Sequence, residues 1–124
     1  MAERTVSPRI LESRWGRVEV DGFGTFKDVR LWPGGAAEWN WKTTGTAHKP
    51  GIQIADVADL PATGAEVVLL TRGRAGALGV KQETVDWLEN QGLEVRVLDT
   101  TAAIEEYNRL RESRRVAAVI HSTC

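Results

Sequence analysis

The stretch that decides the fold is "EVVLLTRG", residues 66–73 of the 124-residue chain. Its four consecutive apolar residues, from Val67 to Leu70, are typical of a strand that is covered on both faces in the middle of a sheet. A glycine-rich loop, "RGRAGALG" at residues 72–79, follows and ends the strand. We therefore predict a central buried strand here, and the elements around it decide the kind of sheet.

The chain after this strand alternates helices and strands. Val85 and Leu88 share an apolar stripe, and Gly92 suits the position just beyond a helix. Thr100 or Thr101 can cap a second helix with its hydroxyl. After the central strand we predict, in order, a helix at 81–92, a strand at 93–99, a helix from about 100 and a strand at 116–124. This order predicts a sheet that is at least partly parallel, with helices packed on it.

The chain before the central strand has the alternation of antiparallel strands. "RWGRVEVDG" at 14–22 and "TFKDVRLW" at 25–32 each alternate apolar and polar residues. Pro33-Gly34-Gly35 predicts a turn, after which "EWNW" at 38–41 can return as a strand. We predict a short helical turn around 55–60, a flexible N-terminal tail at 1–12, and one α/β domain at 13–124. Its central β-sheet is mixed, and a β-hairpin element is joined to it.

Composition narrows the classes of function. Sixteen basic and seventeen acidic side chains give a formal net charge of −1, whereas nucleic-acid binders usually carry a basic excess. No apolar run approaches the ~18–20 residues that span a bilayer, and residues 1–13 lack a signal-peptide core. One cysteine cannot form an internal disulfide. We therefore expect a soluble, cytoplasmic protein that binds neither nucleic acid nor membrane.

Several segments together resemble one small family. They are "KDVRLWPGG", "TGTAHKPGIQIADV", "EVRVLDTTAAIEEYN" and "HSTC". From about Arg14 to Cys124 the chain is similar to the Mth-type domain family, which has an adipogenesis-associated branch in animals. A mitochondrial complex I assembly factor looks like a more distant relative. The resemblance implies a single three-layer α/β domain and a protein that acts through partners, and it implies no cofactor or catalytic residue.

The tryptophan-rich segment is one candidate surface. Trp39 and Trp41 would lie on one face of the predicted returning strand, with Lys42 and Thr44 beside them. Such rings either pack against the sheet or form an exposed platform for a partner. The second alternative predicts a non-enzymatic adaptor or assembly-type protein that contacts a protein partner through these four residues.

The glycine-rich loop is the other candidate site. Glycines and a helix N-terminus let backbone N–H groups approach an anion, and Arg72 and Arg74 can add bidentate contacts. Ligands of α/β sheets collect beyond the carboxyl ends of the strands, where Gly73 and Thr100 should meet. With His48, these residues define a weak anion or small-ligand site, with a cryptic enzyme as a further alternative. The plain alternative is a flexible connection, because neither GxGxxG nor a P-loop pattern is present.

The segment "HSTC" at residues 121–124 contains a histidine and a cysteine, His121 and Cys124, that could form a thiol–imidazole pair. Residues three apart on a strand point to opposite faces, and a neighbouring carboxylate would raise the pKa of the thiol. We therefore expect a structural role for Cys124, with a redox-sensitive surface thiol as the alternative. His48 is expected to anchor its loop, and no HxxH or HExxH spacing occurs, so we predict no metal site.

Overall fold

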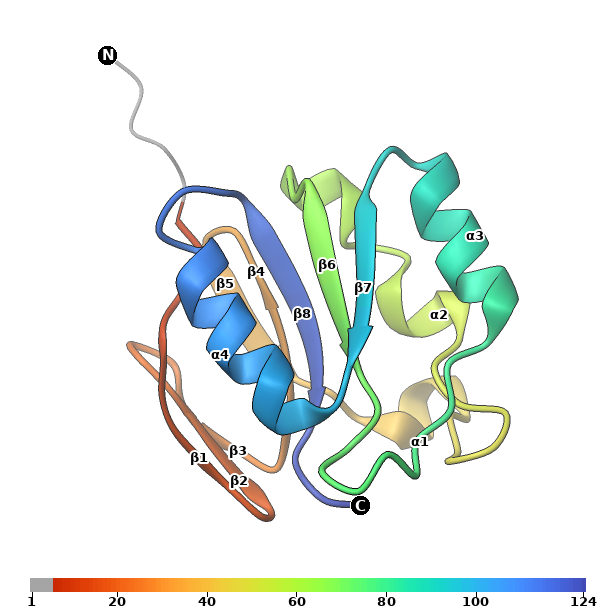
Figure 1. Ribbon diagram of the computed structural model, residues 1–124, viewed down its shortest axis with the longest axis horizontal. Coiled ribbons are helices and arrows are strands. Elements are labelled where there is room, and N and C mark those ends of the chain that lie inside the picture. The colour runs from red at the N-terminus through yellow and green to blue at the C-terminus, as the bar shows by residue number, and fades with distance from the viewer. Residues whose placement is uncertain (1–5) are drawn as a thin grey trace.

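The computed structural model describes residues 6–124 and shows a mixed five-stranded sheet at the centre of the molecule (Figure 1). Its strands lie in the order β5-β4-β8-β6-β7. Their bounds are β4 Asp28–Trp32, β5 Gly35–Glu38, β6 Val67–Thr71, β7 Glu94–Leu98 and β8 Val116–His121. β6, β7 and β8 are parallel, whereas β4 pairs antiparallel with β8 and with β5. The predicted mixed α/β sheet is confirmed, with β6 buried along its whole length.

A second, smaller sheet is antiparallel and covers part of one face. It contains β1 (Ile10–Arg14), β2 (Arg17–Val20) and β3 (Gly24–Phe26), in that order. The predicted flexible tail at 1–12 overlaps β1, because Ile10 is buried against the core and pairs with Val20. The ordered domain therefore includes residues that we had assigned to the tail, while residues 1–5 lie outside the described part of the chain.

Helices cover both faces of the central sheet, which gives three layers (Figure 1). The helices are α1 Trp41–Thr44, α2 Ile54–Val57, α3 Gln82–Asn90 and α4 Thr100–Leu110, with a 3-10 turn at Pro61–Thr63. Alternate residues of β6 point to opposite faces. Val67 and Leu69 pack with Tyr107 of α4 and with the small sheet, whereas Val68 and Leu70 pack with Leu88 of α3. None of the helices in residues 6–124 is long and apolar enough to cross a bilayer.

Three local predictions are wrong, each for a physical reason. "TFKDVRLW" does not form one strand, because β3 ends at Phe26 and β4 begins at Asp28 in the other sheet. "EWNW" does not return as a strand through Trp41, because Asn40 caps helix α1 by accepting from the N–H of Lys42. Thr100 does not cap α4, because its hydroxyl donates to the carbonyl of His121 instead.

The carboxyl ends of the parallel strands β6, β7 and β8 meet at one edge of the sheet, the lower edge in Figure 1. Helix α1, the loop at 72–80 and residue Cys124 lie at this edge. β4 runs the opposite way and begins there, since Asp28 is the register partner of His121. This edge therefore collects side chains from both halves of the sequence.

Candidate functional site

A cleft opens at this edge of the sheet, between α1 and the end of β8. Its cavity has a volume of about 420 Å³. The residues that line it are Lys27, Asp28, Glu38, Trp39, Asn40, Trp41, Lys42, His48, His121, Thr123 and Cys124. A cavity of this size suits a small molecule. Polar side chains and aromatic rings converge on this cleft.

His121 is held in a fixed orientation inside the cleft. Its Nδ1 lies 3.0 and 3.1 Å from the two carboxylate oxygens of Asp28, and both residues are buried. Asp28 also accepts from the N–H of Ser122 at 3.0 Å. Burial, the largest influence, lowers the pKa of His121, but the hydrogen bonds and charges of Asp28 and Cys124 outweigh it and raise that pKa. A hydrogen bond from Nδ1 to Asp28 leaves Nε2 on the side of the ring that faces away from the carboxylate, where the hydroxyl of Thr123 lies 3.4 Å from it.

Cys124 lies next to His121, which corrects our expectation. Strand β8 ends at His121, and Cys124 adopts a positive φ of 48°, so the opposite-face rule for strands does not apply. Hydrogen bonding by Thr123, whose hydroxyl donates to Sγ at 3.5 Å, and then by His121 lowers the pKa of the thiol. The charges of His121 and Lys27 act in the same direction, so the pKa is lowered where we had expected it to be raised.

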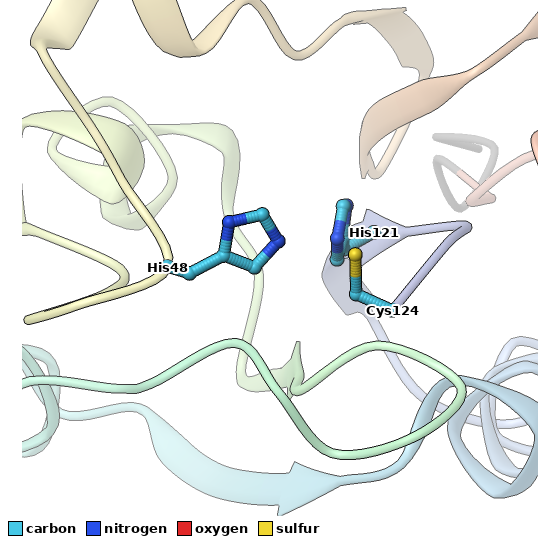
Figure 2. Close-up of side chains that lie close together, drawn as sticks. All are labelled: His48, His121 and Cys124. Carbon is cyan, nitrogen blue, oxygen red and sulfur yellow. The ribbon is translucent and has the colours of Figure 1, made fainter.

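His48 approaches the pair from the opposite side of the cleft. Figure 2 shows its ring pointing from the loop after α1 toward His121 and Cys124. Trp41 packs on both imidazoles, with ring centroids 5.0 Å from His48 and 4.7 Å from His121. One ligand atom from each of His48, His121 and Cys124 lies within 4.8 Å of the others. Trp41 thus forms the aromatic wall against which the two imidazoles are placed.

The glycine-rich loop holds the segment that carries these groups. The backbone N–H of Arg74 donates to Thr123 at 3.2 Å, and its Nε donates to the carbonyl of Ser122 at 2.8 Å. Gly73 has φ of +86°, and a Cβ there would lie 2.7 Å from the Thr123 carbonyl oxygen. The hydroxyl of Thr100 donates to the carbonyl of His121 at 2.6 Å. These residues form a clamp on residues 121–124.

The five residues that we predicted as a ligand site therefore have separate positions. Gly73 and Thr100 do meet, since the Thr100 N–H donates to the Gly73 carbonyl at 3.1 Å, and Arg74 joins them in the clamp. Arg72 turns back on its own loop and donates to the carbonyls of Gly76 and Leu78. Of the five, His48 lines the cleft.

The predicted partner surface is divided in a similar way. Trp39 is only 4% exposed, and its indole N–H donates to the buried carboxylate of Asp56 at 3.0 Å. Thr44 donates to the same carboxylate at 2.6 Å. Lys42 is exposed and Trp41 is half-buried at the wall of the cleft. These four residues therefore do not form one exposed aromatic face.

The cleft brings together groups that can transfer a proton, present a thiolate or coordinate a metal ion. Sequence reasoning missed Asp28 entirely and dismissed the pairing of His121 with Cys124. The one signal for Asp28 was a carboxylate at the start of an apolar strand, and nothing local linked it to His121, 93 positions away. Of the residues predicted for either candidate site, His48, Trp39, Trp41 and Lys42 line the cleft.

Most of this chain is similar to known proteins. Residues 10–121 match the family model described as "Protein of unknown function (DUF498/DUF598)". A conserved hypothetical protein, PH1505 from Pyrococcus horikoshii OT3, is 27% identical over 94% of this chain and 99% of its own, with a TM-score of 0.78. A protein of Bordetella parapertussis is 25% identical over 95% of this chain and 98% of its own, with a TM-score of 0.74.

A Mth938-like domain from Bordetella pertussis has the same fold. It is 21% identical over 93% of this chain and 85% of its own, with a TM-score of 0.70. The predicted Mth-type domain is confirmed by these similarities, while the adipogenesis-associated and complex I branches stay predictions. With its family match from residue 10 to residue 121 and its mixed α/β sheet, the chain belongs to the DUF498/DUF598 family of Mth938-like domains.

Proposed function

We propose that this protein is a small-ligand-binding domain whose site is the cleft between α1 and the end of β8. The observation that carries the proposal is the convergence of Trp41, His48, His121 and Cys124 on one cavity of about 420 Å³. Pockets with aromatic walls and a few convergent polar groups are the usual form of small-molecule sites. The proposal keeps the predicted edge of the sheet but moves the ligand from the glycine-rich loop to this cleft.

The charges around the cleft favour a ligand that carries a negative charge. Lys27 and Lys42 are exposed at the rim, and both line the cavity. Glu38 also lines it, while the carboxylate of Asp28 is already engaged by His121. A planar group can stack on the Trp41 ring, and a carboxylate or phosphate can reach the lysines. The class of ligand is therefore a small anion with a flat apolar part.

The test is a titration of ¹⁵N-labelled protein with benzoate and phenyl phosphate, followed by amide and indole N–H resonances. We expect saturable shifts at Trp41, His48 and His121. The Lys42→Ala variant should bind the probes about two- to fivefold more weakly, as expected for one exposed charge pair. Lys81→Ala, whose side chain lies outside the cleft, is the matched control. Shifts that are scattered over the surface, or equal affinities for both variants, would remove the cleft as the site.

A protein-binding adaptor is the second candidate function. It is favoured by Trp15, which is 62% exposed at the turn between β1 and β2. Exposed tryptophans are frequent anchors of interfaces. It also agrees with the resemblance to the Mth-type domain family, which implies a protein that acts through partners. Native mass spectrometry on gently purified, untagged protein separates the two candidates. A retained small mass supports the ligand-binding domain, and a co-purified polypeptide that is lost in Trp15→Ala supports the adaptor.

A further inference from the structure

The structure assigns a zinc-type metal site, with one open coordination position, to His48, His121 and Cys124. The inference deepens the proposed function, and it rests on that function because both concern the same cleft. Two imidazoles and a thiol are ligands that Zn²⁺ prefers, and three protein ligands with a fourth position open to solvent are the pattern of catalytic zinc sites. Spacing along the chain carries no sign of this site, because the ligands come from residues 48, 121 and 124.

The ligand atoms lie close together, although not yet at the spacing of a formed metal site. The three ligand atoms lie within 4.8 Å of one another. Tetrahedral zinc, with bonds of about 2.0–2.3 Å, needs ligand atoms about 3.3–3.6 Å apart. His48 stands in an exposed loop and its ring points toward the other two residues (Figure 2), so we expect its side chain to move toward them when a metal ion binds.

A buried carboxylate supports the most enclosed of the three ligands. Both oxygens of Asp28 contact Nδ1 of His121, and Asp28 is itself fixed by the N–H of Ser122. Histidine ligands usually donate their second ring nitrogen to such a carboxylate, which fixes the tautomer and leaves the other nitrogen for the metal. For His121 that nitrogen is Nε2, and a metal ion there would replace its 3.4 Å contact with the Thr123 hydroxyl. Trp41 packs on both imidazoles and restricts their orientation. This support is independent of the clustering of the three ligands.

The clamp places the third ligand with little freedom. The carbonyl of Cys124 accepts from the N–H of Ala77 at 3.0 Å, and that of Thr123 accepts from the N–H of Arg74 at 3.2 Å. All three ligands line the cavity, so the fourth position would open into it, and Lys27 and Lys42 also line it. Two lysines oppose a bare cation but favour an anion bound to it, so the open position suits the anionic ligand proposed above.

The experiment is a titration of chelator-treated, reduced protein with Co²⁺, followed by back-titration with Zn²⁺. We expect one equivalent of Co²⁺ to give thiolate-to-cobalt charge-transfer absorption and the d–d bands of a tetrahedral ion, both removed by Zn²⁺. Cys124→Ser should lose the charge-transfer band. Asp28→Asn should keep the band but bind Zn²⁺ about 10–100-fold more weakly. His48→Ala should lose at least as much affinity, whereas the adjacent Lys49→Ala should match the unmodified protein.

Two outcomes overturn the inference. One is the absence of stoichiometric binding of Co²⁺ and Zn²⁺, and the other is binding that persists equally in Cys124→Ser and His48→Ala. Circular dichroism of each variant shows whether it is folded. His48 is exposed, so His48→Ala is less able than Cys124→Ser to disturb the fold. The anion titration on metal-free protein separates this failure from that of the proposed function. If benzoate binds while Zn²⁺ does not, only the metal site fails; if Zn²⁺ binds and no probe shifts the cleft with or without metal, only the proposed ligand class fails.

Discussion

Replacing Gly73 by alanine should both destabilise the domain and release the segment that carries Cys124. The backbone at Gly73 has φ of +86°, and that left-handed region costs about 1–2 kcal/mol for a residue with a Cβ. The new Cβ would also lie 2.7 Å from the Thr123 carbonyl oxygen, whereas ordinary contact begins at 3.4 Å. This contact must therefore open by 0.3 Å to reach 3.0 Å, below which real Cβ contacts are essentially never seen, and by 0.7 Å to become an ordinary contact.

That movement weakens the two backbone hydrogen bonds that Thr123 and Cys124 accept from Arg74 and Ala77. Each is worth about 0.5–1.5 kcal/mol, so Gly73→Ala should lose about 2–5 kcal/mol in total. Gly92→Ala is the matched control, because its φ is +91° and a Cβ added there would meet open space, with no atom beyond its chain neighbours within 4 Å. It should lose about 1–2 kcal/mol only.

Urea denaturation gives the two free energies of unfolding, and the rate of thiol labelling by a disulfide reagent reports on Cys124. We expect the larger loss of stability and a faster reaction in Gly73→Ala alone. Equal losses in the two glycine variants, with the same labelling rate, would show that the clamp does not hold this segment.

Two further predictions concern the core and the pH dependence of stability. Trp39→Phe should lower the free energy of unfolding by about 1.5–3 kcal/mol, the contribution of a hydrogen bond to a charged group, because Asp56 loses its indole donor. A change below about 0.5 kcal/mol in urea denaturation would show that this hydrogen bond does not stabilise the fold. A hydrogen bond from the N–H of Arg115 lowers the pKa of Glu66, so its stabilisation is present above the unfolded value near 4.5 and is lost as the pH falls through the lower folded pKa. Glu66→Gln should therefore lower Tm slightly at pH 7, and it should not lower Tm in acid below the folded pKa of Glu66. Glu105→Gln is the control. A decrease in Tm that is the same at both pH values, or a decrease of the same size in Glu105→Gln, would contradict this prediction.

The second half of the fold could be predicted from the sequence because its signals are local and agree with one another. β6 has a continuous apolar run, and α4 repeats Ala103, Ile104, Tyr107 and Leu110 at helical spacing. The first half was harder, since alternation continued across Lys27 and across Asn40. At Asn40 a capping hydrogen bond overrode the alternation, and at Lys27 the chain changed sheets, which no local pattern signals.

The candidate site was less predictable than the fold. The edge of the sheet followed from the strand order, but the residues at it depend on three-dimensional contacts. Asp28 and His121 meet through the register of β4 on β8, and Cys124 meets His121 because the chain turns at the end of its strand. Rules for spacing along one strand apply to neither contact.

The antiparallel register between β4 and β8 has a consequence for folding. Asp28 and His121 face each other only when the first strand of the central sheet has joined the last, and a slip of one residue would turn Asp28 to the opposite face. Contacts so distant in sequence require the closure of a long loop and form late on average. The Asp28–His121 pair therefore forms only in a chain whose central sheet is complete and in the native register. A chain that has folded only in part, or in the wrong register, lacks this pair and with it the fixed orientation of His121 in the cleft.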